Sequence, residues 1–552
     1  MKTRVCLINV CWVVFSALFA VAERPNIVFI LLDDVGTGWI PPYADRLSPP
    51  DVETEIVDVY SRKMAGGRPV DVQKHIEAAR RCMPTLSRLA REGAVFDNCF
   101  TTTSLCAPSR SGLLTGTFQQ RWGAYRNPDV DHHGIPADQA LIAGPLQQAG
   151  YRCAAIGKWH VSVKDESLKE KIWTDTLGRD LPMPQSFNQF NSEWRDTLER
   201  WGYTTSCKPG QHPLDRGFDY YFGYNLYQSR FFNALGLWEN HDLIPPRPDG
   251  EFLTELFNDK SCAFIESALK DEKPFFLYYA PMTLHGPVVP PPEKYSEPFD
   301  AGVAFSDEYA GHLFALDKGI EQIFQTLEKY NQTQNTLFVF SCDNGCTSMG
   351  VPPYNAPNRG GKGSGWLGGL NVPLVIWWPG KVQRKVTQEA VSQVDLFPTL
   401  LEAASVNPPS NIDGKSLLPF LRGETEQGPR EAVFAAGIHS SRWSYSYEAD
   451  GEWNKKDASD CPMYVWTLQD NRVRLRMTAT PPGLYKVLPD GLSQRAMLFD
   501  LKTDRKQHHD IANESPELVQ QMDASIHRWL GAMNVPWTSQ QEEYQTLLEQ
   551  TR

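Results

Sequence analysis

Nearly continuous apolar runs constrain most strongly what this chain can fold into. They cover residues 26–32, 274–280 and 336–340, and each is rich in β-branched or aromatic side chains. Strands of this kind are buried on both faces, which is typical of parallel sheets covered by helices. Two further strands are expected over residues 151–157 and 372–378. The pattern predicts an α/β fold with a large, mostly parallel central sheet.

Three helices are expected beside this sheet. The apolar positions of residues 307–330 recur at helical spacing, which predicts an amphipathic helix. A second helix is predicted over residues 84–93, because Pro84 suits its first turn and Gly93 suits its C-cap. A third is predicted over residues 137–149. Alternating strands and helices favour the same fold class.

The chain length and a change of composition predict two domains after a short leader. A chain of 552 residues exceeds what one simple core holds. We assign residues 23–423 to a large N-terminal domain, with an irregular insertion at residues 40–82 that has little periodicity and several prolines and glycines. Beyond Gly423 the hydrophobic patterns become shorter and turn sequences become more frequent. Residues 424–552 are therefore predicted to form a smaller α+β subdomain that includes a helix over residues 515–533.

Residues 1–22 have the pattern of a secretory signal peptide. Lys2 and Arg4 form a basic start, an apolar run follows over residues 5–19, and residues 20–22 offer a small-residue cleavage site. We expect export to a periplasm, the extracellular space or a lysosome. Export permits disulfides, although spacing does not fix their pairing. No later run is apolar enough to span a bilayer. The net charge of −12 argues against a nucleic-acid binder.

Polar side chains directly follow two of the predicted strands. Asp33 and Asp34 come after the first run, and Asp343 and Asn344 follow the run at residues 336–340. In open α/β sheets, ligands bind beyond the carboxyl ends of the strands. These residues form an oxygen-only set, which favours Ca²⁺ or Mg²⁺ over zinc. Each pair taken alone is equally an ordinary turn sequence.

Residues 106–116 read CAPSRSGLLTG and place a cysteine before a predicted helix. Pro108 is tolerated in the first helical turn, so Cys106 faces a helix N-terminus, which is an anion site. Arg110 adds planar donors suited to an oxyanion. A lone cysteine there is equally consistent with a buried structural residue. The stretch resembles the signature of the formylglycine-dependent (type I) sulfatases, C-x-P-S-R-x-x-x-L-T-G, at every fixed position. In that family the cysteine is oxidised after translation to formylglycine.

Two further stretches resemble sulfatase motifs at strand ends. The motif Gly-Lys-Trp-His contains Lys158 and His160, which lie two residues apart and are expected to point the same way on an extended chain. Taken without the resemblance, an exposed surface pair is the simpler interpretation. The family often has two histidines, three residues apart, after the strand predicted at 274–280. Here His285 fills the second place, and Met282 stands in the first.

A glycine-rich segment at residues 359–369 resembles the sulfatase lysine loop. It lacks the residue order of a phosphate-binding P-loop, G-x-x-x-x-G-K-[ST]. The resemblance places Lys362 on the substrate sulfate. The family usually has a Glu where this chain has Leu367 and an Arg where it has Asn371, so the contacts that support the loop are expected to differ. Residues 212–223 resemble another recurrent segment of the family, without an assigned role.

The resemblance implies the alkaline-phosphatase-like fold, with a small C-terminal antiparallel sheet and helix, and hydrolysis of a sulfate ester. It implies formylglycine at position 106, made by a formylglycine-generating enzyme, and Ca²⁺, with Mg²⁺ as the alternative. The implied metal ligands are Asp33, Asp34, Cys106, Asp343 and Asn344. The implied groups around the sulfate and its leaving oxygen are Arg110, Lys158, His160, His285 and Lys362.

The substrate and two other functions stay open at this stage. An exported member with an aromatic-rich central region favours a sulfated carbohydrate as its partner. A phosphoester or phosphonate hydrolase of the same fold has overlapping needs for oxyanion and metal binding. A non-catalytic carbohydrate-binding relative is the alternative outside the enzymes, although the presence of Cys106, both metal pairs and both lysines argues against it.

Overall fold

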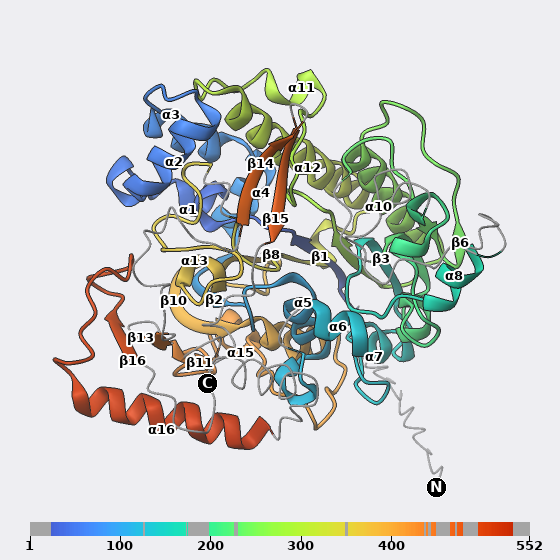
Figure 1. Ribbon diagram of the computed structural model, residues 1–552. Helices are drawn as coiled ribbons and strands as arrows, with labels where there is room; N and C mark the ends of the chain where they lie inside the picture. The colour runs from blue at the N-terminus through green and yellow to red at the C-terminus, as the bar shows by residue number, and fades with distance from the viewer. Residues whose placement is uncertain are drawn as a thin grey trace, which may run out of the picture.

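A ten-stranded sheet runs through the centre of the molecule (Figure 1). Its strand order is β10-β2-β9-β8-β1-β7-β3-β4-β5-β6. This structure is a computed structural model, and it describes residues 24–124, 127–172, 174, 198–225, 230–347, 351–434, 438–439, 443–448, 464–469, 472–477 and 495–533. The expected signal peptide lies outside these residues. The fold class predicted from the apolar runs is confirmed.

The middle of the sheet is parallel. The strand β1 (Asn26–Leu32) lies between β8 (Thr336–Cys342) and β7 (Phe275–Ala280), and it is parallel to both. Next come β3 (Arg152–Lys158) and β4 (Tyr220–Tyr224), also in parallel. Every residue of β1, β7 and β8 is buried, which explains why these strands read as continuous apolar runs. The four strands predicted in this region are confirmed.

The two sides of the sheet contain antiparallel pairs. The strand β9 (Asn371–Trp377) runs antiparallel to β8 and to β2 (Ala94–Phe100), which in turn pairs in parallel with β10 (Lys385–Ser392). At the other edge lie the short antiparallel strands β5 (Trp238–Glu239) and β6 (Asp242–Leu243). The sheet is therefore mixed and mostly parallel.

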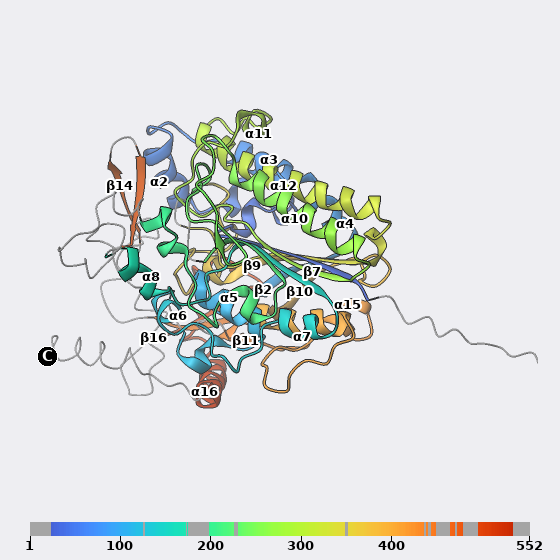
Figure 2. The same cartoon turned by 90° about the vertical axis from the view of Figure 1, so that its right-hand side faces the viewer.

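Helices cover both faces of the sheet (Figure 2). One face carries α4 (Pro84–Glu92), α10 (Leu253–Lys270) and α12 (Ala304–Lys329). The other carries α5 (Cys106–Thr115) and α7 (Ala143–Gln148). Further helices in the described residues are α6 (Asn127–His133), α8 (Glu166–Lys171), α11 (Glu293–Ser296), α13 (Leu367–Leu370), α14 (Leu396–Ala403) and α15 (Leu418–Arg422).

Two helix predictions need correction. The helix expected over residues 137–149 begins only at Ala143, since Pro145 favours a place in the first turn. The insertion at residues 40–82 is not irregular. It contains α1 (Pro41–Ala44), α2 (Thr54–Met64) and α3 (Val72–Arg81). In α2 only Tyr60 is buried, so its sequence lacks the apolar stripe that reveals a helix.

A smaller α+β module follows the main sheet (Figure 1). It contains an antiparallel sheet of β11 (Val433–Phe434), β12 (Ile438–His439), β13 (Trp443–Glu448) and β16 (Arg495–Asp500). The helix α16 (Pro516–Met533) packs on this sheet through Leu498. A separate hairpin is formed by β14 (Tyr464–Gln469) and β15 (Arg472–Met477). These elements confirm the predicted C-terminal strands and helix.

The described residues also bear on membrane insertion and disulfides. None of their helices combines the length and the apolar character that crossing a bilayer requires. Every cysteine in the described ranges is a free thiol, including Cys342 and Cys346 beside the loop after β8. Cys461 and the two cysteines of the expected signal peptide lie outside these ranges.

Candidate active site

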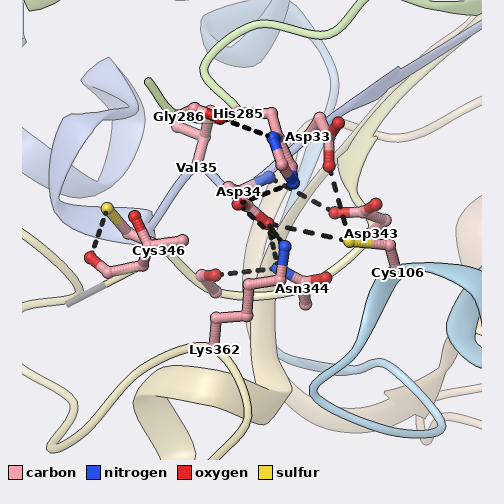
Figure 3. A network of polar contacts seen from close by, with 12 residues as sticks. Asp33, Asp34, Val35, Cys106, His285, Gly286, Asp343, Asn344, Cys346 and Lys362 are labelled. Atoms are coloured by element: carbon pink, nitrogen blue, oxygen red, sulfur yellow. Dashed lines mark hydrogen bonds and ion pairs between the residues drawn. The ribbon is translucent and has the colours of Figure 1, made fainter. Parts of the chain in front are cut away.

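Four oxygen-bearing side chains meet where β1 and β8 end (Figure 3). The two strands are parallel and in register, with Leu32 opposite Cys342. The residues that follow them, Asp33 and Asp34 on one side and Asp343 and Asn344 on the other, therefore lie side by side. All four are buried, with exposed fractions of 0–1%. The structure therefore brings the two predicted pairs together in one cluster.

Cys106 stands at the start of α5 and faces this cluster. Its Sγ lies 3.7 Å from Asp33 Oδ1 and 3.9 Å from Asp34 Oδ1. One ligand atom from each of Asp33, Asp34, Cys106 and Asp343 lies within 4.8 Å of the others. Burial raises the pKa of the Cys106 thiol to about 12, although Lys158 and Lys362 oppose the rise. The thiol is therefore protonated at neutral pH and is a poor nucleophile.

Three cationic side chains pair with the three carboxylates. The pairs are Arg110 Nε with Asp343 Oδ2 (2.9 Å), Lys158 Nζ with Asp33 Oδ2 (2.7 Å) and Lys362 Nζ with Asp34 Oδ1 (2.7 Å). Burial alone would raise the pKa of Asp33. The positive charge of Lys158, with that of other neighbours, instead holds this pKa well below its usual range. Arg110 also donates to the backbone oxygen of Lys158 (3.0 Å), which ties α5 to the end of β3.

Two histidines border the same cluster. His285 Nε2 lies 3.8 Å from Asp34 Oδ2, and its Nδ1 lies 2.9 Å from the backbone oxygen of Gly286. Burial lowers the pKa of His285 to about 4, and it lowers the pKa of His160 well below its usual value, with Lys158 adding to the effect. Both imidazoles are therefore neutral at pH 7. A neutral imidazole has one nitrogen free to accept a proton.

The geometry expected for Lys158 and His160 needs correction. The strand β3 ends at Lys158, and His160 has a φ of 55°, so the chain is not extended there. His160 instead points its Nε2 to within 4.0 Å of Asp131 Oδ1 on α6. Sequence reasoning missed Asp131, because a single acid on a short helix carries no motif. His285 nevertheless lies beside the carboxylate cluster, 3.8 Å from Asp34, and His160 follows two residues after Lys158, which pairs with Asp33.

The lysine loop closes the site from the side of β8. Lys362 N donates to the backbone oxygen of Cys346 (3.0 Å), and Gly363 N donates to that of Ser104 (2.8 Å). The loop is thus fixed both to the segment after Asn344 and to the segment before Cys106. The loop is also held by the C-terminal module. Leu367 N donates to Gln507 Oε1 (3.0 Å), a partner from the C-terminal module that the sequence does not reveal.

The cluster fits a hard divalent cation. Asn344 Nδ2 donates to Asp34 Oδ1 (2.7 Å), whereas Asn344 Oδ1 is buried and has no hydrogen-bond partner among the described residues. A buried acceptor without a partner is rare and calls for an explanation. Here it lies with three carboxylates and no soft ligand except Cys106. Oxygen donors of this kind suit Ca²⁺ or Mg²⁺.

The fold and the site together define the class. A mostly parallel sheet between helices, with carboxylates and a cysteine gathered at its strand ends, is the arrangement of an alkaline-phosphatase-like hydrolase. The Sulfatase family model matches residues 25–406. The chain belongs to the sulfatase family, and it is a sulfuric ester hydrolase. This membership favours the sulfatase over the phosphoester hydrolase and the non-catalytic relative that the sequence left open.

Curated relatives of this chain are named sulfatases. YdeN of Escherichia coli K12, named as a sulfatase, is 27% identical over 544 residues, which cover 95% of this chain and 89% of the relative. The N-acetylgalactosamine-6-sulfatase of Mus musculus is 28% identical, and the match covers 75% of this chain and 71% of the relative. Arylsulfatase A of Homo sapiens is also 28% identical, and the match covers 76% of this chain and 72% of the relative.

Solved structures show the same fold. The PsFucS1 sulfatase from Pseudoalteromonas sp. aligns with a TM-score of 0.63 and 19% identity, covering 94% of this chain and 92% of that one. The protein named Ps i-CgsB aligns with a TM-score of 0.63 and 21% identity, covering 94% of both chains. These likenesses confirm the alkaline-phosphatase-like fold that the sequence predicts.

Proposed function

We propose that this sulfatase hydrolyses a sulfate ester on a carbohydrate, with formylglycine made from Cys106 as its nucleophile. The observation that carries the proposal is the position of Cys106, whose Sγ faces the carboxylates of Asp33 and Asp34 from the start of α5. Relatives named N-acetylgalactosamine-6-sulfatase from several mammals support the carbohydrate substrate.

The modification explains why a cysteine with a raised pKa occupies this place. A buried, protonated thiol cannot serve as a thiolate nucleophile. The aldehyde form of position 106 would supply, once hydrated, one hydroxyl to attack sulfur and a second whose deprotonation releases sulfate. Because Cys106 is only 1% exposed, a formylglycine-generating enzyme must reach it before the chain has finished folding.

The cation site of the proposal consists of Asp33, Asp34, Asp343, Asn344 and position 106. We favour Ca²⁺, because all the protein side chains apart from position 106 offer oxygen, and Mg²⁺ is the alternative. A bound cation would withdraw charge from the sulfate oxygens and lower the pKa of a nearby hydroxyl. The buried Oδ1 of Asn344, which accepts no hydrogen bond from the described part of the chain, supports this ligand set.

The remaining residues handle charge and protons. Arg110 and Lys158 are fully buried and hold the carboxylates, so they fix the charge balance around the reacting sulfur. His285 and Lys362 have the most exposed side chains of the proposed catalytic set, 15% and 6%. The alcohol therefore leaves on their side, and one of them supplies its proton. The neutral imidazole of His160 accepts the proton whose removal releases sulfate.

We also propose that the chain is exported. The support is the basic start, the apolar run and the small-residue site within residues 1–22. Sequencing the N-terminus of the protein from its natural host tests this, and a start near Glu23 is the expected result.

The function is tested with purified protein and two small substrates. We expect hydrolysis of an aryl sulfate and of a 6-sulfated N-acetylgalactosamine, and much slower hydrolysis of the matching phosphate monoester. Metal content measured on the same sample should show a divalent cation. Turnover of the phosphate ester without turnover of either sulfate would contradict the proposal.

A further inference from the structure

A turn of the C-terminal module forms hydrogen bonds with the loop that carries Lys362. The turn spans residues 504–509, shortly after β16, and contains Gln507. We infer that Gln507 is a positioning residue, which holds the lysine loop so that Lys362 reaches the sulfate. This inference rests on the role proposed above for Lys362, and it adds a contribution from the C-terminal module to catalysis.

Gln507 contacts both ends of the lysine loop. Its Oε1 accepts from Leu367 N (3.0 Å), and its backbone oxygen accepts from Arg359 Nη1 (3.1 Å). Gln507 is 1% exposed, so both contacts are shielded from solvent. A buried backbone N–H that loses its acceptor is costly. The side chain of Gln507 therefore fixes where the loop ends and α13 begins.

The two ends of the loop meet, with Lys362 between them. Gly368 N donates to the backbone oxygen of Arg359 (2.7 Å), which closes the neck of the loop. Lys362 lies within this closed loop, where its backbone N–H is bound to Cys346. A shift of the neck therefore moves the backbone of Lys362, and with it the Nζ that contacts Asp34.

Arg505 fixes the turn to the rest of the molecule. Its Nε donates to Asn358 Oδ1 (2.9 Å), which belongs to the residue before the loop. Its other nitrogens donate to Asn98 Oδ1 (2.6 Å) and to the backbone oxygen of Asp97 (2.9 Å), both on β2. The turn is thus held by the main sheet on one side while it holds the lysine loop on the other.

The side chains of the loop also face the C-terminal module. Leu367 packs in an apolar cluster with Phe499 and Leu501. The ring of Trp366 meets that of Phe499 edge to face at 5.9 Å, and Arg359 stacks on Trp366 at 4.2 Å. Leu367 is where the family usually has a Glu. In this chain the C-terminal module provides support at the position where that Glu is missing.

The test compares two replacements of Gln507. Gln507→Met keeps the size of the side chain but removes the acceptor for Leu367 N, so we expect kcat/KM for an aryl sulfate to fall about tenfold, mainly through KM. Gln507→Glu keeps an oxygen at this place and should restore kcat/KM to within about threefold of wild type. Lys506→Met is the matched control, because Lys506 Nζ donates to Pro50 O (2.7 Å) and not to the loop.

A double-mutant cycle separates positioning from general destabilisation. In a Lys362→Ala background, Gln507→Met should change kcat/KM by less than about twofold, because the residue it positions is gone. An equal loss in both backgrounds, or no loss in either, would overturn the inference. If Lys362→Ala alone keeps wild-type kcat/KM, the proposed role of Lys362 fails instead. Should Gln507→Met not fold, Arg359→Gln removes the other contact and takes its place in the cycle.

Discussion

At the scale of single residues, the site is a buried set of charges that balance one another. Three carboxylates, on Asp33, Asp34 and Asp343, each have a cationic partner within 2.9 Å. Charges buried in this way are costly unless they are paired and hydrogen-bonded. The pairing explains how β1 and β8 can end in acidic residues inside the protein, and it has two measurable consequences.

The first consequence concerns removal of the cation. We expect a chelator to abolish sulfatase activity, while the protein still unfolds in one cooperative thermal transition, since each carboxylate retains a partner from the chain. Activity and differential scanning fluorimetry on the same sample measure this. Restoring Ca²⁺ should restore activity. Loss of the cooperative transition on chelation would show that the cation is needed for the fold itself.

The second consequence concerns single partners. Lys158→Met leaves Asp33 buried without its closest cation, so we expect a loss of about 3–5 kcal/mol in the free energy of unfolding, together with loss of activity. Lys362→Met is the comparison, because Lys362 lies on a loop and Asp34 keeps a hydrogen bond from Asn344. It should cost activity but clearly less stability. Urea unfolding of both variants measures the two losses in unfolding free energy. Equal losses would contradict the account.

At the scale of elements, the contact between α12 and α4 contains a buried acid. Asp317 on α12 accepts from Thr85 N (2.8 Å) and Leu86 N (2.9 Å) at the start of α4. It thereby caps α4, whose own N-cap residue, Met83, offers no side-chain hydrogen bond. Burial nevertheless raises the pKa of Asp317 to about 6.

This shift predicts how stability depends on pH. The folded pKa of Asp317 lies above its ordinary value of 3.8, so the folded chain binds the proton more tightly than the unfolded chain. The stabilising contribution is complete below about pH 4 and is lost as the pH rises through 6. The difference in unfolding free energy between wild type and Asp317→Asn should therefore fall over this range and be constant above it. A difference that does not change between pH 4 and 7 would contradict the assignment.

Elements differ in how far the sequence predicts them. The strands β1, β7 and β8 are buried throughout, so their apolar runs reveal them. The helix α2 escapes prediction because Tyr60 is its one buried residue, and α3 because its four buried residues include a histidine and two alanines. Two of their buried residues, Tyr60 and His75, pack through Ser306 on α12, a contact that spans more than 200 residues.

At the scale of the whole molecule, the C-terminal module is joined to the main sheet by an apolar cluster. Phe499 within β16 and Leu501 just after it pack with Phe100, Leu367 and Leu370. The cluster is small, yet it includes the base of the lysine loop. Stability of the module and the geometry of the site are therefore linked.

This link predicts a stability loss on truncation of one ring. Phe499 is 2% exposed, so Phe499→Ala should lower the free energy of unfolding by about 3–5 kcal/mol. Val386→Ala is the control, because Val386 is 63% exposed on β10 and should change stability by less than about 0.5 kcal/mol. Denaturant unfolding measures both. A Phe499→Ala variant as stable as the control would show that the module packs more loosely than described.

The sequence predicts those residues of the candidate site that belong to a long motif or that follow a predicted strand. Cys106 carries a long signature, and the acidic pairs follow apolar runs directly. Asp131 and Gln507 have neither feature, and they reach the site through contacts with residues distant in the chain. Gln507 lies 140 residues from Leu367. Such contacts depend on how the modules pack, which no local pattern encodes.

The chemical state of Cys106 tests the account most directly. Trypsin cleaves after Arg91 and Arg110, so one peptide of residues 92–110 contains both Cys99 and Cys106. Cys99 is a buried thiol of β2 and serves as an internal reference. In protein from the natural host, we expect alkylation of Cys99 alone and, at position 106, a mass lowered by the difference between CH₂SH and CHO. A peptide with both cysteines alkylated would contradict the proposed mechanism.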